Sequence, residues 1–424
     1  MQRQNQHSKL TVANNNKDNK RTPKGERVIP VIITEEQYSK FISDVKYART
    51  LVLEQFKEHH QLFPEGMDNF KFNGFTSISS KMNLKKRQII VKDVHYQLHP
   101  SFVLPDMRDK ITDEITKGML LRSHGVSLWL IVECFGKNES FWYCLTQSLS
   151  KNSIVGSTNY QPTAQVSENL SVDEKHIEIK GEKHYIATTV AQGCIMGAEI
   201  AEKADEEELT KSYGVFKDEA TALNPDYQPK SINTDGWGAT INSMKKLFEF
   251  AILIRCFLHA FLKIRNEAKR KIQEEFDLCA KLVWECYRAD NKRSFSQRIR
   301  RLREWALANM KAVKMQKAVI KLCDRRNEFM SCFDNKNAHR TSNMLDRLMR
   351  LMDRKIFKAQ GFHGSKEAAN NGIRAFSLLH NFAPSCPKSR KEDLKSPAER
   401  LNGFAFSENW LKNLLIASSM NGRR

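Results

Sequence analysis

Apolar and polar residues repeat with different periods along the chain, and each change of period marks a new segment. Residues 33–60 repeat apolar side chains every three or four positions, which predicts a helix. Residues 1–27 hold almost no apolar side chains, which is typical of a disordered basic tail. Residues 61–105 mix short apolar runs with three prolines and predict irregular structure. In the first helix we expect five buried positions, namely Tyr38, Phe41, Val45, Leu51 and Phe56.

Residues 108–150 carry three successive helical patterns, and we expect 28–156 to form an N-terminal DNA-binding region. The first helix ends at Gly125, and two short helices follow within 126–150, joined at Gly136. This pattern matches a helix-turn-helix, whose second helix enters the major groove, and it also matches an ordinary helical hairpin. Because 138–150 contains no lysine or arginine, bases would be contacted by uncharged side chains and phosphates by Lys137 or Lys151. The candidate base-contacting residues are Ser140, Tyr143, Thr146 and Gln147.

After a polar linker at 157–169, the apolar period becomes two, which is typical of strands. Three strand patterns are separated by turns at Gly181 and Gly193, and such short turns force antiparallel pairing in sequence order. A helix, a strand ending at Asp235, a second helix and a fully buried strand are predicted next, at 205–223, 229–235, 238–250 and 251–256. This order of elements is that of the ribonuclease-H-like α/β (α+β) fold, and another mixed α/β domain is the alternative.

The rest of the chain is predicted to be helical. Residues 257–338 contain no strand pattern and would form a helical insertion, with Trp284 and Trp305 as apolar anchors. A further helix at 339–357 presents Met344, Leu345, Leu348, Met349 and Met352 on one apolar face. The catalytic domain would therefore comprise 170–256 and 339–385, and a C-terminal tail would follow at 386–424.

The net charge of +20 implies an anionic partner, and nucleic acid is favoured over a membrane surface. Residues 241–340 alone hold 24 lysines and arginines against 11 aspartates and glutamates, a net charge of +13. The nine cysteines include no Cys-x-x-Cys pair, which argues against a zinc ribbon. The longest apolar run, at 250–262, is too short to span a membrane, and the first residues resemble no signal peptide. We expect an intracellular protein, with DNA phosphates contacted by Arg298, Arg300, Arg301 and Arg303.

Two aspartates occupy strands that would be neighbours in such a sheet. Asp173 lies within the first strand and Asp235 ends the fourth. Two carboxylates a few Å apart repel each other and are usually kept together by a divalent cation. A third acid on a later helix would complete a site for two metal ions about 4 Å apart. Gly236 and Gly238 would let backbone and nucleic acid approach closely. Glu174, next to Asp173, is expected to be solvated, and the alternative is that it supports the metal ligands.

These residues resemble a family. SVDEKHIEI and NTDGWGAT resemble the two aspartate strands of DDE-class bacterial insertion-sequence transposases, nearest to the Mutator-like group. Cys256 and His259 resemble the Cys-x-x-His signature of that group, and TSNMLDRLMR resembles its third-acid helix, with Asn343 three residues before Asp346. The match covers about residues 100 to 385, and Asp346 stands where the family usually has glutamate.

The resemblance implies a transposase that binds terminal inverted repeats and target DNA. Asp173, Asp235 and Asp346 would hold two Mg²⁺ or Mn²⁺ ions, with Cys256, His259 and Asn343 supporting the site. It also implies a homodimer or larger assembly in the bacterial cytoplasm, associated with the nucleoid, and no membrane. Three alternatives stay open. Asp346 could merely favour the helix dipole while Asp353 or another acid serves as ligand, the chain could be a catalytically inactive, domesticated DNA-binding derivative, or it could be a hydrolase acting on RNA.

Overall fold

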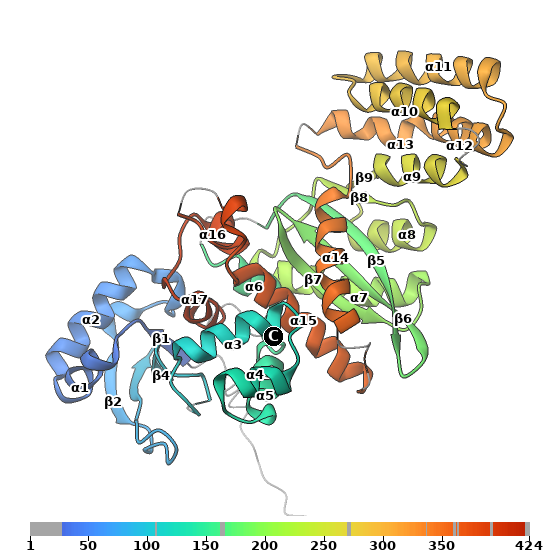
Figure 1. The fold of residues 1–424 in the computed structure, drawn as a ribbon. Helices are drawn as coiled ribbons and strands as arrows, with labels where there is room; N and C mark the ends of the chain where they lie inside the picture. The colour runs from blue at the N-terminus through green and yellow to red at the C-terminus, as the bar shows by residue number, and fades with distance from the viewer. Residues whose placement is uncertain are drawn as a thin grey trace, which may run out of the picture.

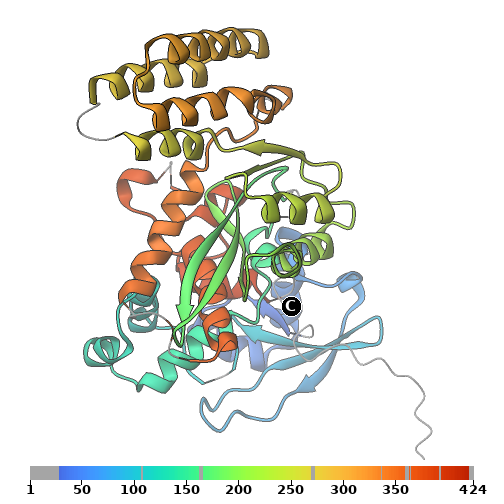
Figure 2. The ribbon, with the colours of Figure 1, turned by 90° about the vertical axis from the view of Figure 1, so that its right-hand side faces the viewer.

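The computed structural model describes residues 28–106, 108–161, 166–268, 273–335, 337–358, 362, 364–390 and 393–419. The predicted tail at 1–27 lies outside them. The fold is mixed α/β, with two mixed sheets and many helices, and is compatible with the predicted α+β class. In Figures 1 and 2 the N-terminal sheet and the helices of residues 257–330 lie at opposite ends of the molecule. None of the described helices has the length and apolar character needed to cross a membrane.

The N-terminal region contains a four-stranded sheet, so the prediction of irregular structure at 61–105 is wrong. Its strand order is β1-β4-β3-β2, with β1 parallel to β4 and the other pairs antiparallel. Pro100 ends β4, where it faces Val31 of the short parallel strand. The elements are β1 (Val28–Val31), α1 (Glu35–Ser43), α2 (Val45–Glu58), η2 (His60–Leu62), η3 (Met67–Asn69), β2 (Lys71–Phe75), β3 (Arg87–Val91) and β4 (Val94–Pro100).

The helix predicted at 33–60 is two helices. Asp44 ends α1 and also begins α2, where its carboxylate accepts a hydrogen bond from the backbone N–H of Tyr47. This break changes the helical phase, so Val45 is 53% exposed although it was expected to be buried. Phe41 is buried as predicted, and Tyr38, Leu51 and Phe56 are half-buried against the same core.

Three helices occupy 113–149 as predicted, and a fourth follows them. Asn138 caps α5 through its side chain, whereas Ser127 precedes α4 without a side-chain hydrogen bond. Trp142 of α5 is buried against Gly118 of α3, where a β-carbon would collide with its ring. Residues 157–160 were predicted to belong to a polar linker, but they are buried. The helices are α3 (Asp113–Ser123), α4 (Leu128–Phe135), α5 (Glu139–Leu149) and α6 (Ile154–Thr158).

The second sheet has the order β7-β6-β5-β8-β9. Strands β5, β6 and β7 pair antiparallel in sequence order, and β8 and β9 add parallel strands beside β5, as the pattern predicted. Strand β9 is only half-buried because it lies at the sheet edge, which corrects the expectation of a fully buried strand. The elements are β5 (Asn169–Ile179), β6 (Glu182–Ala191), β7 (Cys194–Ala201), α7 (Glu206–Leu223), β8 (Ser231–Thr234), α8 (Gly238–Leu247) and β9 (Ile252–Arg255).

Helices cover both faces of this sheet (Figure 1). Helices α7 and α8 pack on one face, where Val172, Ala187 and Met196 are buried. Helices α14 (Asn343–Lys358) and α15 (Lys366–Phe382) cover the other face, against Ile177, Ile186 and other alternate strand residues. The predicted apolar face of the 339–357 helix is confirmed, since its Leu345, Leu348, Met349 and Met352 are buried there and Met344 is half-buried.

Between β9 and α14 the described residues form a helical insertion with its own apolar core. The backbone N–H of Phe257 donates to the carbonyl of Arg340, 3.1 Å away, so the two ends of the insertion lie side by side. Trp284 and Trp305 are half-buried in or against this core. The helices are α9 (Phe257–Glu267), α10 (Gln273–Tyr287), α11 (Lys292–Asn309), α12 (Val313–Asp324) and α13 (Arg326–Met330), followed by η5 (Ser331–Asp334).

Residues 386–424 were predicted to form a tail, but their described part returns to the N-terminal core. After η6 (Pro387–Ser389) come α16 (Pro397–Asn402) and α17 (Trp410–Ala417). The buried side chains of α17 join the core that also contains residues of β1, α2 and α3, and α17 itself packs against α3, α6 and α15. Helix α15 joins the two cores, because Ile373 and Phe376 face the second sheet while Leu379 and Phe382 belong to the N-terminal core.

A buried ion cluster stabilises this junction. Arg374 of α15 is 1% exposed and forms ion pairs with Glu199 of β7 and Glu219 of α7. Its guanidinium also donates to the carbonyls of Ser150 and Asn152, 3.1 and 3.0 Å away. One side chain therefore connects the second sheet, α7 and the end of α5.

Candidate metal-binding site

Parallel pairing of β5 with β8 brings two of the predicted acids to one edge of the sheet. Ser171 pairs with Asn233, and Asp173 and Asp235 each lie two residues beyond that pair. Adjacent strands lie about 4.8 Å apart, so the two carboxylates start from neighbouring backbone positions. Asp235 accepts a hydrogen bond of 2.7 Å from the backbone N–H of Trp237, which fixes the turn into α8.

The third predicted acid reaches the same place from another element. Asp346 lies in the first turn of α14. One of its carboxylate oxygens, a carboxylate oxygen of Asp173 and a ring nitrogen of His259 all lie within 4.8 Å of one another. All three side chains are partly buried. The sequence pointed to His259 as a supporting residue, whereas the structure gives it a potential ligand atom. Asp235 lies outside this close group but near enough that its charge acts on Asp173.

The electrostatics of Asp173 are those of a crowded acidic site. The pKa of Asp173 is raised to about 6, chiefly by burial. The positive charge of His259 acts to lower it, and the charges of Asp235 and Asp346 act to raise it. The carboxylates therefore repel one another in a partly dehydrated site. A divalent cation would relieve that repulsion.

A hydrogen-bond network around Ser342 holds His259 and Asp346. The Ser342 hydroxyl donates to the Asp346 carboxylate at 3.2 Å and lies 3.5 Å from Nδ1 of His259. The Ser342 backbone N–H donates to the buried Cys256 thiol at 3.2 Å. The hydrogen bond with Cys256 raises the pKa of His259 to about 9, with Asp173 and Asp346 adding to the effect. Cys256 and His259 thus lie beside the carboxylates, as the resemblance to the Cys-x-x-His signature led us to expect.

Glu174, expected to be solvated, instead supports the site from behind. Residues 173 and 174 point to opposite faces of β5, and Glu174 accepts hydrogen bonds from Tyr213 of α7 at 2.7 Å and from Thr240 of α8 at 2.8 Å. Burial raises the pKa of Glu174 to about 7, and its Oε2 is buried without a hydrogen-bond partner among the described residues. The sequence gave no signal for this role because both partners come from distant helices.

Gly236 has a structural reason that differs from the expected one. Its φ of +87° is one that other residues rarely adopt, and a β-carbon would collide with the guanidinium of Arg255. Arg255 in turn forms an ion pair of 2.8 Å with Glu328 of the helical insertion. Close approach of nucleic acid is therefore not needed to explain this glycine, and at Gly238 a β-carbon would meet open space.

The other acid of α14 does not reach the site. Asp353 forms an ion pair of 2.8 Å with Lys175, and both side chains are substantially exposed. Asp346, and not Asp353, is therefore the acid of α14 that lies with Asp173 and His259. Asn343, predicted to support Asp346, is exposed at the start of α14.

The predicted DNA-contacting residues of the helical hairpin divide into two groups. Ser140 and Tyr143 are exposed on α5, Gln147 is half-buried, and the exposed Lys137 forms an ion pair with Asp109. Thr146 cannot contact a base, because it is 3% exposed and its hydroxyl donates to the carbonyl of Trp142.

The four arginines of α11 also differ in exposure. Arg301 is exposed, and Arg300 is exposed with a 3.6 Å ion pair to Glu304 on the same helix face, whereas Arg298 is half-buried and donates to the carbonyl of Glu285. Arg303 forms an ion pair with Asp324 of α12. Arg300 and Arg301 are therefore the better placed of the four to contact a phosphate.

Comparison with models of known protein families gave no match, and comparison with curated proteins gave none either.

Proposed function

We propose that this protein is a metal-dependent DNA nuclease and strand transferase, a transposase of the DDE class with a ribonuclease-H-like catalytic domain. The observation that carries the proposal is the convergence of Asp173, Asp346 and His259 within 4.8 Å, beside Asp235 on the adjacent parallel strand. The strand order β7-β6-β5-β8-β9, with helices on both faces, supports the fold assignment.

The donor set fits a divalent cation. Carboxylate oxygens are the ligands preferred by Mg²⁺ and Mn²⁺, and imidazole is compatible with Mn²⁺. The raised pKa of Asp173 is that of a buried carboxylate near two further acids, and a bound cation would favour its charged form. Asp173, Asp235 and Asp346 would hold two ions, with His259 as a further ligand or a neighbouring cation.

Bound divalent ions supply an activated water or 3′-hydroxyl and stabilise charge on the leaving oxygen at phosphorus. The residues of the chain provide the geometry for this chemistry. Ser342 orients Asp346, the Trp237 backbone orients Asp235, and Tyr213 and Thr240 hold Glu174 behind the strand that carries Asp173. In this proposal the basic helical insertion binds duplex DNA, and the protein acts as a dimer or larger assembly on paired DNA ends.

The test is cleavage of a labelled duplex made from the DNA that flanks the gene, with Mg²⁺ or Mn²⁺. Asp173→Asn and Asp235→Asn should each lower cleavage at least a hundredfold while leaving duplex binding within about twofold, because the amide keeps the shape but loses the charge that holds metal. Glu178→Gln, at an exposed position of the same strand β5, is the matched control and should cleave like the wild type.

The proposal fails if either aspartate variant keeps cleavage within tenfold of the wild type. Wild-type protein that binds the duplex and never cuts it, with either metal, would indicate a catalytically inactive DNA-binding derivative instead. Cleavage confined to RNA would indicate a hydrolase of the same fold.

A further inference from the structure

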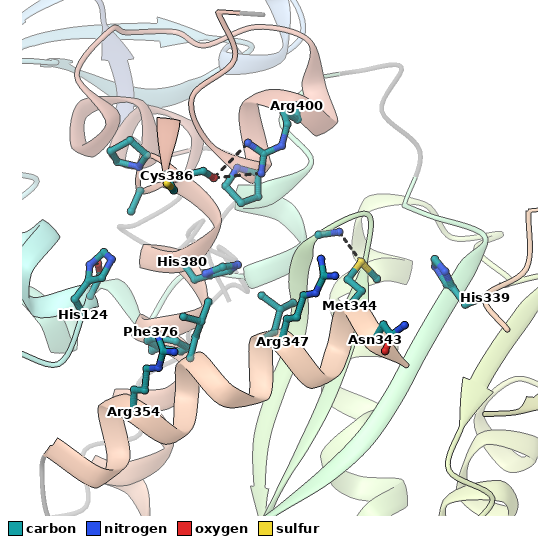
Figure 3. Close-up of a pocket in the computed structure, with 18 of the residues that line it drawn as sticks. His124, His339, Asn343, Met344, Arg347, Arg354, Phe376, His380, Cys386 and Arg400 are labelled. Carbon is teal, nitrogen blue, oxygen red and sulfur yellow. Dashed lines mark hydrogen bonds between the residues drawn. The ribbon is translucent and has the colours of Figure 1, made fainter. Parts of the chain in front are cut away.

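A cleft of about 800 Å³ lies beside α14 (Figure 3). It is formed by the end of α3, the first three turns of α14, the end of α15 and the segment 383–400. Three arginines line it, Arg347, Arg354 and Arg400, and its described lining contains no aspartate or glutamate. A cleft with this charge is suited to an anion.

The arginines of α14 form a stripe along the cleft. Arg347, Leu351 and Arg354 follow one another at four- and three-residue spacing, so they share one side of the helix and span about 10 Å along its axis. Arg347 and Arg354 are both exposed and form no ion pair within the described part of the chain. Arg347 follows Asp346 directly in α14, but successive side chains leave a helix about 100° apart, so the arginine stripe and Asp346 lie on different sides of one helix.

The inner wall of the cleft is apolar and aromatic. Leu348 and Phe376 line it, and the Phe376 ring lies nearly parallel to the His380 ring with centroids 6.3 Å apart. Nε2 of His380 is buried and has no hydrogen-bond partner among the described residues. A buried polar atom without a partner costs free energy unless a ligand or water satisfies it. A planar group with hydrogen-bonding atoms would fit this wall, and an anionic group would fit the arginine stripe.

We propose that this cleft binds a nucleotide, with its phosphate at Arg347 and Arg354 and its base against Leu348, Phe376 and His380. The volume lies within the range of small-molecule sites. The nucleotide would be an unpaired one in the DNA strand that enters the carboxylate site, and in this respect the inference rests on the proposed function. A free nucleotide would make the same contacts, and the experiment separates these two sources.

The experiment measures binding of a labelled 12-residue single-stranded oligodeoxynucleotide to the full chain by fluorescence anisotropy. EDTA is present, so that neither metal nor cleavage contributes. Arg347→Ala and Arg354→Ala should each weaken binding about fivefold to tenfold. Arg350→Ala is the matched control, because it removes the same charge from an exposed position of the same helix outside the cleft, and it should change binding less than twofold. Leu351→Glu, which adds a carboxylate at a partly exposed cleft position, should weaken binding as strongly.

Competition with deoxyadenosine monophosphate and with inorganic phosphate identifies the source. Displacement of the oligonucleotide by the mononucleotide, but not by phosphate, supports a site that also accepts free nucleotides. No displacement by either, together with the arginine effects, supports a site for a nucleotide within a strand.

Equal weakening by Arg350→Ala and by the two cleft variants would overturn the inference, because it would indicate only general attraction by positive charge. Unchanged binding by both cleft variants would overturn it as well. Because EDTA removes the metal, this assay does not depend on cleavage. A failure of the cleft would therefore leave the cleavage test of the proposed function unaffected, and a failure of cleavage would leave the binding result standing.

Discussion

Replacing Arg374 by methionine should destabilise the protein more than any surface substitution on the same helix. The guanidinium is 1% exposed, and Arg374→Met would leave Glu199 and Glu219 buried together without a counter-charge. Removing one partner from a buried ion pair costs about 3–5 kcal/mol. The carbonyls of Ser150 and Asn152 would also lose their donors. We therefore expect a loss of about 3–5 kcal/mol in the free energy of unfolding.

Urea unfolding followed by tryptophan fluorescence measures this loss. Lys366→Met is the matched control, because Lys366 begins the same helix and pairs with Glu202 at the surface, where a pair contributes about 0–1 kcal/mol. Adding Glu199→Gln and Glu219→Gln to Arg374→Met should recover part of the loss, since no buried charge then remains. If Arg374→Met and Lys366→Met unfold at the same urea concentration, the ion cluster does not stabilise the junction and the reasoning is refuted.

Three further predictions concern the metal site, pH and DNA. Asp346→Ala should abolish cleavage whereas Asp353→Ala should keep it within about twofold, and a dead Asp353→Ala beside an active Asp346→Ala would show that the other acid is the ligand. Burial lowers the pKa of His380 from 6.5 to about 4, so its contribution of about 3 kcal/mol to stability is present above pH 6.5 and is lost as the pH falls to about 4. The free energy of unfolding should therefore change less between pH 7 and pH 4.5 in His380→Asn than in the wild type. An equal change in both proteins would contradict this assignment. Replacing Arg300 and Arg301 by alanine should make DNA affinity fall less steeply with salt concentration, by the amount expected for the loss of about two phosphate contacts. An unchanged slope would mean that α11 does not touch DNA.

The elements of the second sheet could be predicted from sequence because each carries its own periodicity. Strand β5 alternates buried and exposed residues over its last four positions, and the short turns at Gly181 and Gly193 force β5, β6 and β7 to pair antiparallel in sequence order. The element order then indicated that Asp173 and Asp235 lie on adjacent strands. The pairing of Ser171 with Asn233 agrees with that expectation. The prediction of Asp346 depended instead on the resemblance of its helix to a family motif, with Asn343 three residues before the acid.

Features that depend on distant partners could not be predicted in this way. Strand β2 is mostly exposed, so it shows no apolar alternation, and the N-terminal sheet was missed. Glu174 looks like a surface residue until α7 and α8 bring Tyr213 and Thr240 to it. The cleft beside α14 is likewise formed by segments from four parts of the chain.

The packing of α17 into the N-terminal core has a consequence for synthesis. Val31 and Trp410 belong to one core but are separated by about 380 residues, which a ribosome adds in roughly 20–80 s at 5–20 residues per second. During that interval the N-terminal core lacks the buried side chains that α15 and α17 contribute to it. The second sheet and the helical insertion can fold meanwhile, so the first segment to be made is among the last to be completed. A nascent chain stalled before residue 410 would carry an open apolar surface at its N-terminal end, which makes it a ready substrate for chaperones.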